Sequence, residues 1–149
     1  MKIAIGSDHG GYALKELVKN YLIEKGYEVE DFGAYSTESV DYPDYAVKAA
    51  TAVSNGKCDR GIVICSTGIG ISIAANKIKG VRAALCADIM CARLTREHND
   101  TNVLALGSFV VTEEMAYAIV DTWLETDFSN EERHQRRIDK ITEIENKYL

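Results

Sequence analysis

Chemistry is most readily placed in the segment Cys65-Ser66-Thr67-Gly68-Ile69-Gly70, which follows a run of apolar residues. Gly68 and Gly70 allow the backbone to turn tightly and to present N–H groups, and a helix that begins here directs its positive end at the same point. A helix N-terminus also favours the reactive thiolate form of a neighbouring cysteine. The segment therefore predicts an anion cradle with a reactive thiol at Cys65. The residues alone also allow an ordinary loop in which Cys65 is a small buried apolar side chain, which is the commoner role of a free cysteine.

The glycine spacing does not match two common phosphate-binding motifs. The dinucleotide pattern GxGxxG fails because Ile73 occupies the position of its third glycine, and GxxxxGK[ST] occurs nowhere in the chain. A zinc site and a thioredoxin-like motif are also unsupported, since the four cysteines show no CxxC spacing and no histidine at zinc-finger spacing. Cys58, Cys86 and Cys91 lie outside any such cradle, so we assign them structural roles.

The three histidines, His9, His98 and His134, each stand beside charged or polar residues. A surface position is the ordinary explanation for each of them. Arg133 and Arg137 are four residues apart on one predicted helix face, so together they could hold one phosphate. Acidic neighbours also allow that face to be solvated and salt-bridged; these are Glu131, Glu132 and Asp139.

Strand-like and helix-like segments alternate along the chain, and these elements must position the residues above. Strands are predicted at 2–7, 27–32, 60–65, 81–86 and 103–106, and helices at 12–25, 45–53, 71–79, 89–96, 112–124 and 131–147. Such alternation predicts an α/β fold with one domain over residues 1–149, a Rossmann-like three-layer sandwich. Its five-stranded parallel sheet has helices on both faces and a C-terminal helix.

In sheets of this kind, ligands bind beyond the carboxyl ends of the strands. Three segments follow predicted strands with suitable residues: Asp8-His9-Gly10-Gly11, the Cys65 to Gly70 segment, and Ala87-Asp88. We therefore expect the functional site at this edge of the sheet.

The composition is that of an ordinary globular protein and limits the partners. The chain has 149 residues, 46% of them hydrophobic and 27% charged, with a single proline, which excludes a disordered adaptor. A net charge of -6 disfavours nucleic acid. Apolar runs stay far below the roughly 20 residues of a membrane span, so no membrane partner is expected. No export signal is recognised before the first strand, and the unpaired thiols suit a reducing cytoplasm.

Several longer motifs are similar to those of type B ribose-5-phosphate isomerases, in the same order and over essentially the whole chain. They are Gly6-Ser7-Asp8-His9-Gly10-Gly11, Asp41-Tyr42-Pro43, the 65–70 segment with Ala74-Ala75-Asn76-Lys77, Arg96-Glu97-His98-Asn99-Asp100-Thr101-Asn102 and Arg133-His134-Gln135-Arg136-Arg137. The resemblance implies interconversion of ribose 5-phosphate and ribulose 5-phosphate through an enediolate, with no metal and no redox cofactor.

The resemblance also implies roles for single residues. In that family the position of Cys65 is the base that carries a proton between the carbonyl carbon and its neighbour, and the position of Thr67 helps to move the hydroxyl proton. The positions of Asp8 and His98 assist opening of the furanose ring, and that of Asn99 holds substrate hydroxyls. The positions that bind phosphate correspond to His9, Arg133 and Arg137. Further contacts to substrate are expected from Ser66, Gly68, Ile69, Gly70 and Ile71.

Two positions refine this placement. One branch of the family uses a glutamate just after the second glycine as its base, whereas this chain has Ile71 there and keeps the cysteine, so it resembles the cysteine branch. Many members carry an arginine as a phosphate ligand where this chain has Phe109. Arg136 would then contribute to phosphate binding, or non-phosphorylated sugars would be accepted.

The topology separates two of the expected catalytic residues. His98 precedes the last predicted strand, at the amino end of the sheet, whereas Cys65 ends a strand, and a five-residue strand is about 17 Å long. We therefore predict a symmetric homodimer, which could pair further into a dimer of dimers, in which the partner supplies His98 and Asn99.

Other functions remain open at this point. An isomerase for six-carbon substrates, such as galactose 6-phosphate, allose 6-phosphate or their free sugars, fits the same fold. A receiver-like or flavodoxin-like binding module would need an acceptor aspartate and a lysine where Cys65 and Gly107 stand. A sulfhydryl hydrolase would need a histidine base within about 3 Å of Cys65.

Overall fold

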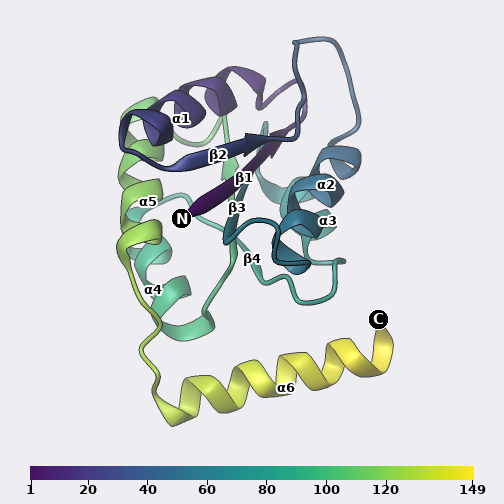
Figure 1. Cartoon of the computed structure of the whole chain (residues 1–149), viewed down its shortest axis with the longest axis vertical. Coiled ribbons are helices and arrows are strands. Elements are labelled where there is room, and N and C mark those ends of the chain that lie inside the picture. Colours follow the sequence, from purple (N-terminus) through teal and green to yellow (C-terminus); the bar gives the residue numbers. More distant parts are fainter.

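The computed structural model describes residues 1–149 and forms a parallel β-sheet covered by helices on both faces (Figure 1). The strands are β1 (Lys2–Ser7), β2 (Glu28–Asp31), β3 (Arg60–Cys65), β4 (Ala83–Leu85) and β5 (Val103–Gly107). The helices are α1 (Tyr12–Glu24), α2 (Tyr42–Ser54), α3 (Ile69–Ala75), α4 (Ile89–Asn99), α5 (Glu113–Glu125) and α6 (Glu132–Tyr148). The predicted α/β fold with a five-stranded parallel sheet is confirmed.

The order of the strands is β2-β1-β3-β5-β4, and every neighbouring pair is parallel. From β1 the chain passes through α1 to β2 on one side and later returns through α2 to β3 on the other side. The direction of winding thus reverses between β1 and β3, where such sheets open a crevice for ligands. Ser7 pairs with Ile64 at this point, one residue before Asp8 and Cys65.

The two faces of the sheet bury different side chains because successive strand residues point to opposite sides. Ile3 and Ile5 face the large cluster formed with α1, α4 and α5, which includes the fully buried Trp123. Ala4 and Val63 face the smaller residues of α2 and α3. The alanine-rich inner face of α2 lets it approach the sheet closely beside the carboxyl ends of β1 and β3.

Several elements differ in length from the expectation; α2 begins three residues earlier, at Tyr42, and α3 ends at Ala75 rather than at 79. The helix α3 begins at Ile69 rather than at 71, because Gly68 takes a left-handed conformation directly before it. The edge strand β4 pairs only with β5 and spans three residues, not 81–86. The helix α4 continues to Asn99, three residues beyond the predicted end, and places His98 in its last turn.

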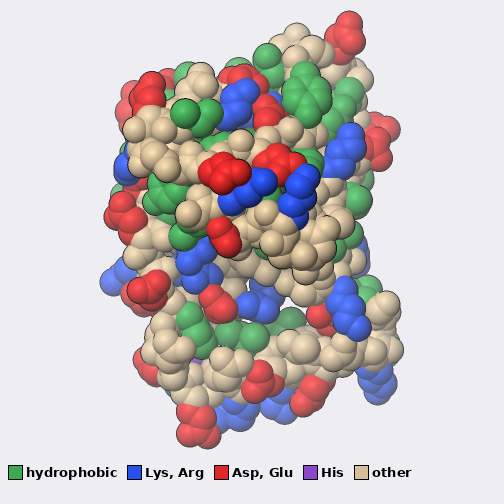
Figure 2. Space-filling model, viewed as in Figure 1, with side chains coloured by type: hydrophobic (Ala, Val, Ile, Leu, Met, Phe, Trp, Pro, Cys, Tyr) green, Lys and Arg blue, Asp and Glu red, His purple; other side chains and the backbone are tan.

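The C-terminal helix α6 lies apart from the sheet and packs mainly on α4 (Figure 1). Its Ile138 is buried, whereas Ile141, Ile144 and Tyr148 of the same predicted apolar stripe are about half exposed or more. Figure 2 shows the hollow between α6 and the rest of the molecule. This groove has a volume of about 550 Å³ and includes Arg82, Asn99 and Ile141 in its lining. None of the helices is both long and apolar enough to cross a membrane.

Candidate active site

The thiol of Cys65 lies at the end of β3 and receives a hydrogen bond from the backbone. The N–H of Gly68 donates to its Sγ over 3.1 Å, and Cys65 is 5% exposed. Gly68 has a φ of 76°, and a Cβ there would lie 2.4 Å from Cδ1 of Leu85, so only glycine fits without strain. The turn therefore directs a backbone donor at the sulfur.

Further backbone donors belong to the first turn of α3. The N–H of Ile69 donates to Oγ1 of Thr67 over 3.2 Å, whereas the N–H groups of Gly70 and Ile71 have no acceptor within the chain. Unpaired N–H groups are expected in the first turn of a helix, and they are available to an anionic ligand. The side chain of Ile71 itself is fully buried in the core, so only its backbone can contribute to binding.

The residues after β1 pack directly against this turn. Asp8 is 7% exposed, and its Oδ1 accepts a hydrogen bond from the N–H of Gly11 over 2.9 Å. A Cβ on Gly10 would lie 2.2 Å from Oγ of Ser66, so the two loops touch at this glycine. Oγ of Ser108, which follows β5, donates to the carbonyl of Gly10 over 2.7 Å. The structure thus brings together the segments of Asp8 and Cys65.

Two aromatic side chains lie at the rim; from the sequence, Phe109 is expected near the phosphate, whereas no role is expected for Tyr42. The ring of Tyr42 lies against Gly70, where an added Cβ would approach it to 2.6 Å. Tyr42 belongs to the Asp41-Tyr42-Pro43 motif, and that motif was the available signal for its role. Phe109 is 81% exposed, and its N–H donates to the carbonyl of Ser66 over 2.9 Å. His9 is exposed at the same edge, with its Nδ1 accepting from the N–H of Val40 over 3.1 Å.

A second group of expected site residues lies at the opposite edge of the sheet. His98 and Asn99 end α4, whereas Arg133, Arg136 and Arg137 are exposed on α6. The carbonyl of Asn102, three residues beyond Asn99, accepts from the N–H of Gly61 near the start of β3. Gly61 and Cys65 are four residues apart along the strand, or about 13 Å. One chain therefore does not bring His98 to Cys65.

The expectation of a surface position is wrong for His134. This side chain is 3% exposed, and its ring stacks on that of His98 with centroids 4.2 Å apart and an angle of 16° between the planes. Burial lowers the pKa of His134 below its usual value, and the neighbouring His98 and Arg133 lower it further. The Arg133 guanidinium, by contrast, is exposed and pairs with Glu131 over 2.7 Å.

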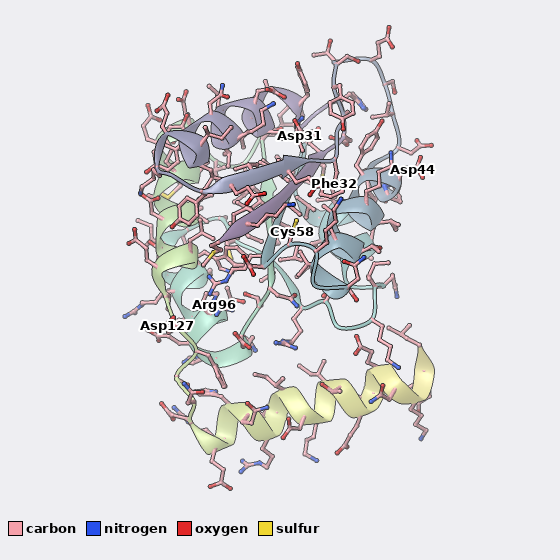
Figure 3. The ribbon with its side chains drawn as sticks, in the orientation of Figure 1. Asp31, Phe32, Asp44, Cys58, Arg96 and Asp127 are labelled. Carbon is pink, nitrogen blue, oxygen red and sulfur yellow. The ribbon has the colours of Figure 1, made fainter.

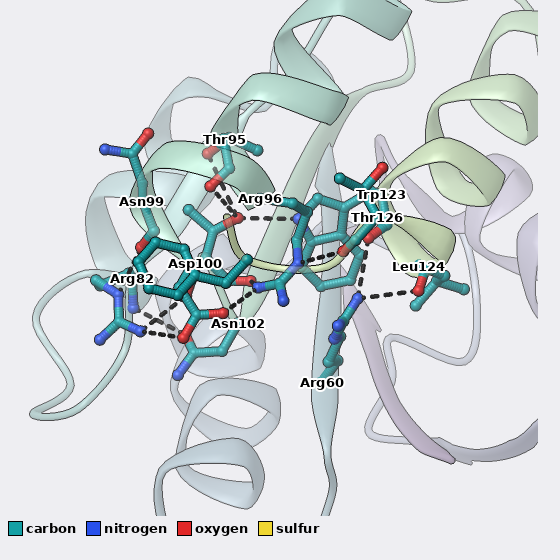
Figure 4. Close-up of polar contacts among 12 residues, drawn as sticks. Arg60, Arg82, Thr95, Arg96, Asn99, Asp100, Asn102, Trp123, Leu124 and Thr126 are labelled. Atoms are coloured by element: carbon teal, nitrogen blue, oxygen red, sulfur yellow. Dashed lines mark hydrogen bonds and ion pairs between the residues drawn. The ribbon is translucent and has the colours of Figure 1, made fainter. Parts of the chain in front are cut away.

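A network of arginines holds the end of α4 in place (Figure 4). The buried Arg96 donates to the carbonyls of Thr101 and Thr126 and pairs with Asp100 over 2.8 Å. Arg82 donates to the carbonyl of Asn99 over 2.9 Å and to that of Asp100 over 2.7 Å. The network satisfies carbonyls that a helix end leaves without partners, so the last turn of α4 has a defined position.

The other three thiols lack the environment of Cys65. Burial raises the pKa of Cys86 to about 12 and also raises that of Cys58, so both stay protonated at neutral pH. Cys91 is exposed, which contradicts the packing role expected from the sequence, and its hydrogen bond with Asp88 raises the pKa of its thiol. Only Cys65 receives a hydrogen bond from a backbone N–H group to its sulfur.

The fold and these groups define a small-molecule enzyme of the parallel α/β class, with a thiol at the point where the strand order reverses. A family model described as Ribose/Galactose Isomerase matches residues 3–141. The chain therefore belongs to the ribose/galactose isomerase family, and it is an isomerase.

Individual relatives agree with this placement. Ribose-5-phosphate isomerase B of Escherichia coli (strain K12) is 53% identical over 144 residues, which cover 97% of this chain and 96% of that protein. The structure of Clostridium thermocellum ribose-5-phosphate isomerase B is 59% identical, with a TM-score of 0.98 and 100% of both chains covered. The Mycoplasma genitalium ribose-5-phosphate isomerase B, solved with bound ribulose-5-phosphate, is 45% identical with a TM-score of 0.92, covering 97% of this chain and 96% of that one.

Proposed function

We propose that this protein interconverts ribose 5-phosphate and ribulose 5-phosphate through an enediolate, with the Cys65 thiolate as the base. In the open-chain aldose, the thiolate removes the proton on C2, the C2–H electron pair forms the C1–C2 double bond, and the π pair of the C1 carbonyl moves to O1. The thiol then delivers the same proton to C1, while Thr67 assists transfer of the hydroxyl proton from O2 to O1 and C2 becomes the carbonyl. Atoms and charge balance without any co-reactant, as an isomerisation requires.

The observation that carries this proposal is the hydrogen bond from Gly68 to the sulfur of Cys65, beside unpaired N–H groups. A donated hydrogen bond stabilises a thiolate over a thiol. The free N–H groups of Gly70 and Ile71 suit the oxygen charge that grows in the enediolate, and they favour the transition state over the neutral substrate. One such donor contributes about 3 kcal/mol to barrier lowering.

The remaining groups suit opening of the sugar ring and binding of phosphate. Asp8 is held by Gly11 beside the thiol, at the right edge of the sheet for contact with the ring oxygen or its hydroxyl. His9 supplies an exposed imidazole at the same edge. Phe109 at this rim supplies no cation, so we infer that the cations for a phosphate come from elsewhere.

A second copy of the chain is the proposed source of those cations. His98, Asn99, Arg133 and Arg137 lie together at the amino edge of the sheet and near the junction of α4 and α6. A symmetric homodimer would bring this group to the Cys65 of the other subunit and complete two equivalent sites. The free thiols support a reducing, cytoplasmic setting for this assembly.

The test is turnover of ribose 5-phosphate by the purified protein and by its Cys65→Ala variant. General-base catalysis contributes about 10²- to 10⁴-fold, so the alanine variant should lose activity by that factor while its melting temperature stays close to that of the wild type. Activity of Cys65→Ala near the wild-type level would contradict the assignment of the base.

A six-carbon sugar or sugar phosphate is the second candidate substrate, and the exposed ring of Phe109 favours it. This apolar side chain lies at the rim beside Ser66 and offers no charge to a phosphate. Rates with ribose 5-phosphate, allose 6-phosphate and free allose, compared in one assay, distinguish the two candidates.

A further inference from the structure

The stacked imidazoles of His98 and His134 join α4 to α6. Their planes are nearly parallel and their centroids are 4.2 Å apart, so the rings lie in close face contact. His134 is 3% exposed, whereas His98 is only half-buried. His134 therefore forms the inner wall against which His98 rests.

The ring of His98 has no other fixed partner. No hydrogen bond within the chain engages either of its nitrogens, so both are free for a ligand. Nε2 of His134 is also buried without a hydrogen-bond partner. A buried nitrogen without a partner has an energetic cost, which indicates that the position is kept for something other than folding stability. The stack is what sets the plane of the His98 ring.

The chain that leads into α6 is attached to the two residues that precede His98. The N–H of Ser129 donates to the carbonyl of Glu97 over 3.1 Å, and Nε of Arg96 donates to the carbonyl of Thr126 over 3.2 Å. Figure 3 shows Arg96 beside the segment that carries Asp127 and leads into α6. These bonds place the first turn of α6, and with it His134, over the last turn of α4.

The charges around His134 keep its ring neutral at neutral pH. Burial, His98, Arg133 and Arg137 all lower its pKa, and Glu131, whose Oε2 is 3.9 Å from Nε2, opposes them only in part. A neutral ring can stack on His98 without repelling a proton that His98 carries or donates.

We propose that His134 is a positioning residue, which holds the imidazole of His98 in the orientation in which His98 assists opening of the sugar ring. This inference rests on the proposed function, in which His98 acts at the site of a second copy. His134 does not touch substrate in this account. It acts through the ring plane of His98.

Two reactions of the same enzyme separate positioning of His98 from general loss of structure. Ribulose 5-phosphate is open-chain, because its only hydroxyl able to close a five-membered ring on the C2 carbonyl carries the phosphate. Exchange of its C1 hydrogen in D₂O needs the Cys65 step alone: the thiolate removes the proton, and a deuteron is returned to C1. Conversion of ribose 5-phosphate needs the same step and also ring opening.

The experiment compares both reactions in the homodimer carrying His134→Ala. We expect conversion of ribose 5-phosphate to fall by about 100-fold, as misplacement of a catalytic group does, while deuterium exchange stays within a few-fold of the wild type. His134→Phe, which restores a neutral planar ring, should recover most of the conversion. Conversion by His134→Ala near the wild-type rate, or an equal fall of both reactions, would overturn the inference.

Controls cover folding and the dependence on the proposed function. Ile138→Ala removes a buried side chain one turn further along α6 and should lower the melting temperature without separating the two reactions. If His134→Ala does not fold, His134→Gln replaces it. Slower conversion of ribose 5-phosphate than in His134→Phe, with deuterium exchange unchanged, supports the inference, and equal conversion in the two variants overturns it.

The His98→Gln variant should show the same selective loss of ribose 5-phosphate conversion. A selective loss in His98→Gln that no His134 variant shows would overturn this inference and leave the proposed function intact. Full activity of both His98→Gln and Cys65→Ala would overturn the proposed function itself.

Discussion

The backbone N–H of Gly68 donates to the sulfur of Cys65 over 3.1 Å, and the left-handed conformation of the same residue, with a φ of 76°, turns the chain that follows into α3. Its Cα also lies so close to Leu85 and to the backbone of Leu106 that a side chain cannot be added without displacing one of them. Gly68 thus forms the turn, directly precedes the first residue of α3 and donates its N–H to the thiol.

Gly68→Ala is expected to damage both stability and catalysis. The new Cβ adds overpacking to an unfavourable backbone conformation, which together cost about 3 kcal/mol of unfolding free energy. Displacement of the N–H donor from Cys65 should also lower kcat by about 100-fold.

Gly56→Ala is the matched control, because Gly56 has a φ of 77° and open space around it. That variant should lose about 1 kcal/mol of unfolding free energy and keep its kcat. Urea unfolding and steady-state kinetics measure both effects, and equal behaviour of the two variants would contradict this account.

Subunit complementation tests whether the site is shared between two chains. Cys65→Ala and His98→Gln should each be nearly inactive alone. A mixed dimer of the two has one site in which both residues are intact, so random co-assembly restores about a quarter of wild-type activity. Co-expression with two different affinity tags allows the mixed dimer to be isolated and assayed. A pure mixed dimer without activity would show that each chain supplies both residues to its own site.

The stability of the protein should depend on pH through His134. Its pKa in the folded chain is lowered from the ordinary 6.5, chiefly by burial and then by His98, so the unfolded chain binds the proton more tightly. The stabilisation is therefore fully present above pH 6.5 and is lost as the pH falls through the lower, folded pKa. Urea unfolding between pH 7.5 and pH 5 should show this loss in the wild type and a smaller one in His134→Phe. Glu131 does not interfere, because Arg133 lowers its pKa from 4.5 and its titration lies below this window.

Much of the fold is predictable because the apolar runs and the glycines that end segments indicate the same strands and helices. Continuous apolar runs such as 60–65 identify buried parallel strands, and Gly26 and Gly80 mark the ends of the segments that precede β2 and β4. The residues after β1 and β3 follow from the same reasoning, since the carboxyl ends of neighbouring parallel strands must meet. The contact between the loops of Asp8 and Cys65 is of this kind.

The rest depends on contacts between distant segments. Burial of His134 is not visible in its charged helix, because it arises from the way in which Arg96 and Glu97 attach the preceding segment to α4. The start of α3 is misplaced by a pattern-based prediction because Gly68 satisfies both a turn and a helix cap. His98 and Cys65 lie at opposite edges of the sheet within one chain, so the sequence shows only that they are separated, and their pairing in a dimer stays a proposal.

Substitution of Phe109 tests how the site distinguishes its substrates. Phe109 is exposed at the rim, where many members of the family carry an arginine, and its backbone is fixed by the carbonyl of Ser66. Phe109→Arg should lower KM for ribose 5-phosphate by about tenfold, the effect of one charge-assisted hydrogen bond, and leave KM for a free sugar unchanged. Phe109→Ala serves as the control for loss of the ring, since it adds no charge and should not lower KM for the phosphate. An equal effect of Phe109→Arg on phosphorylated and free sugars would mean that this rim does not face the phosphate. A loss of free-sugar turnover in Phe109→Ala alone would instead show that the aromatic ring itself contacts the sugar.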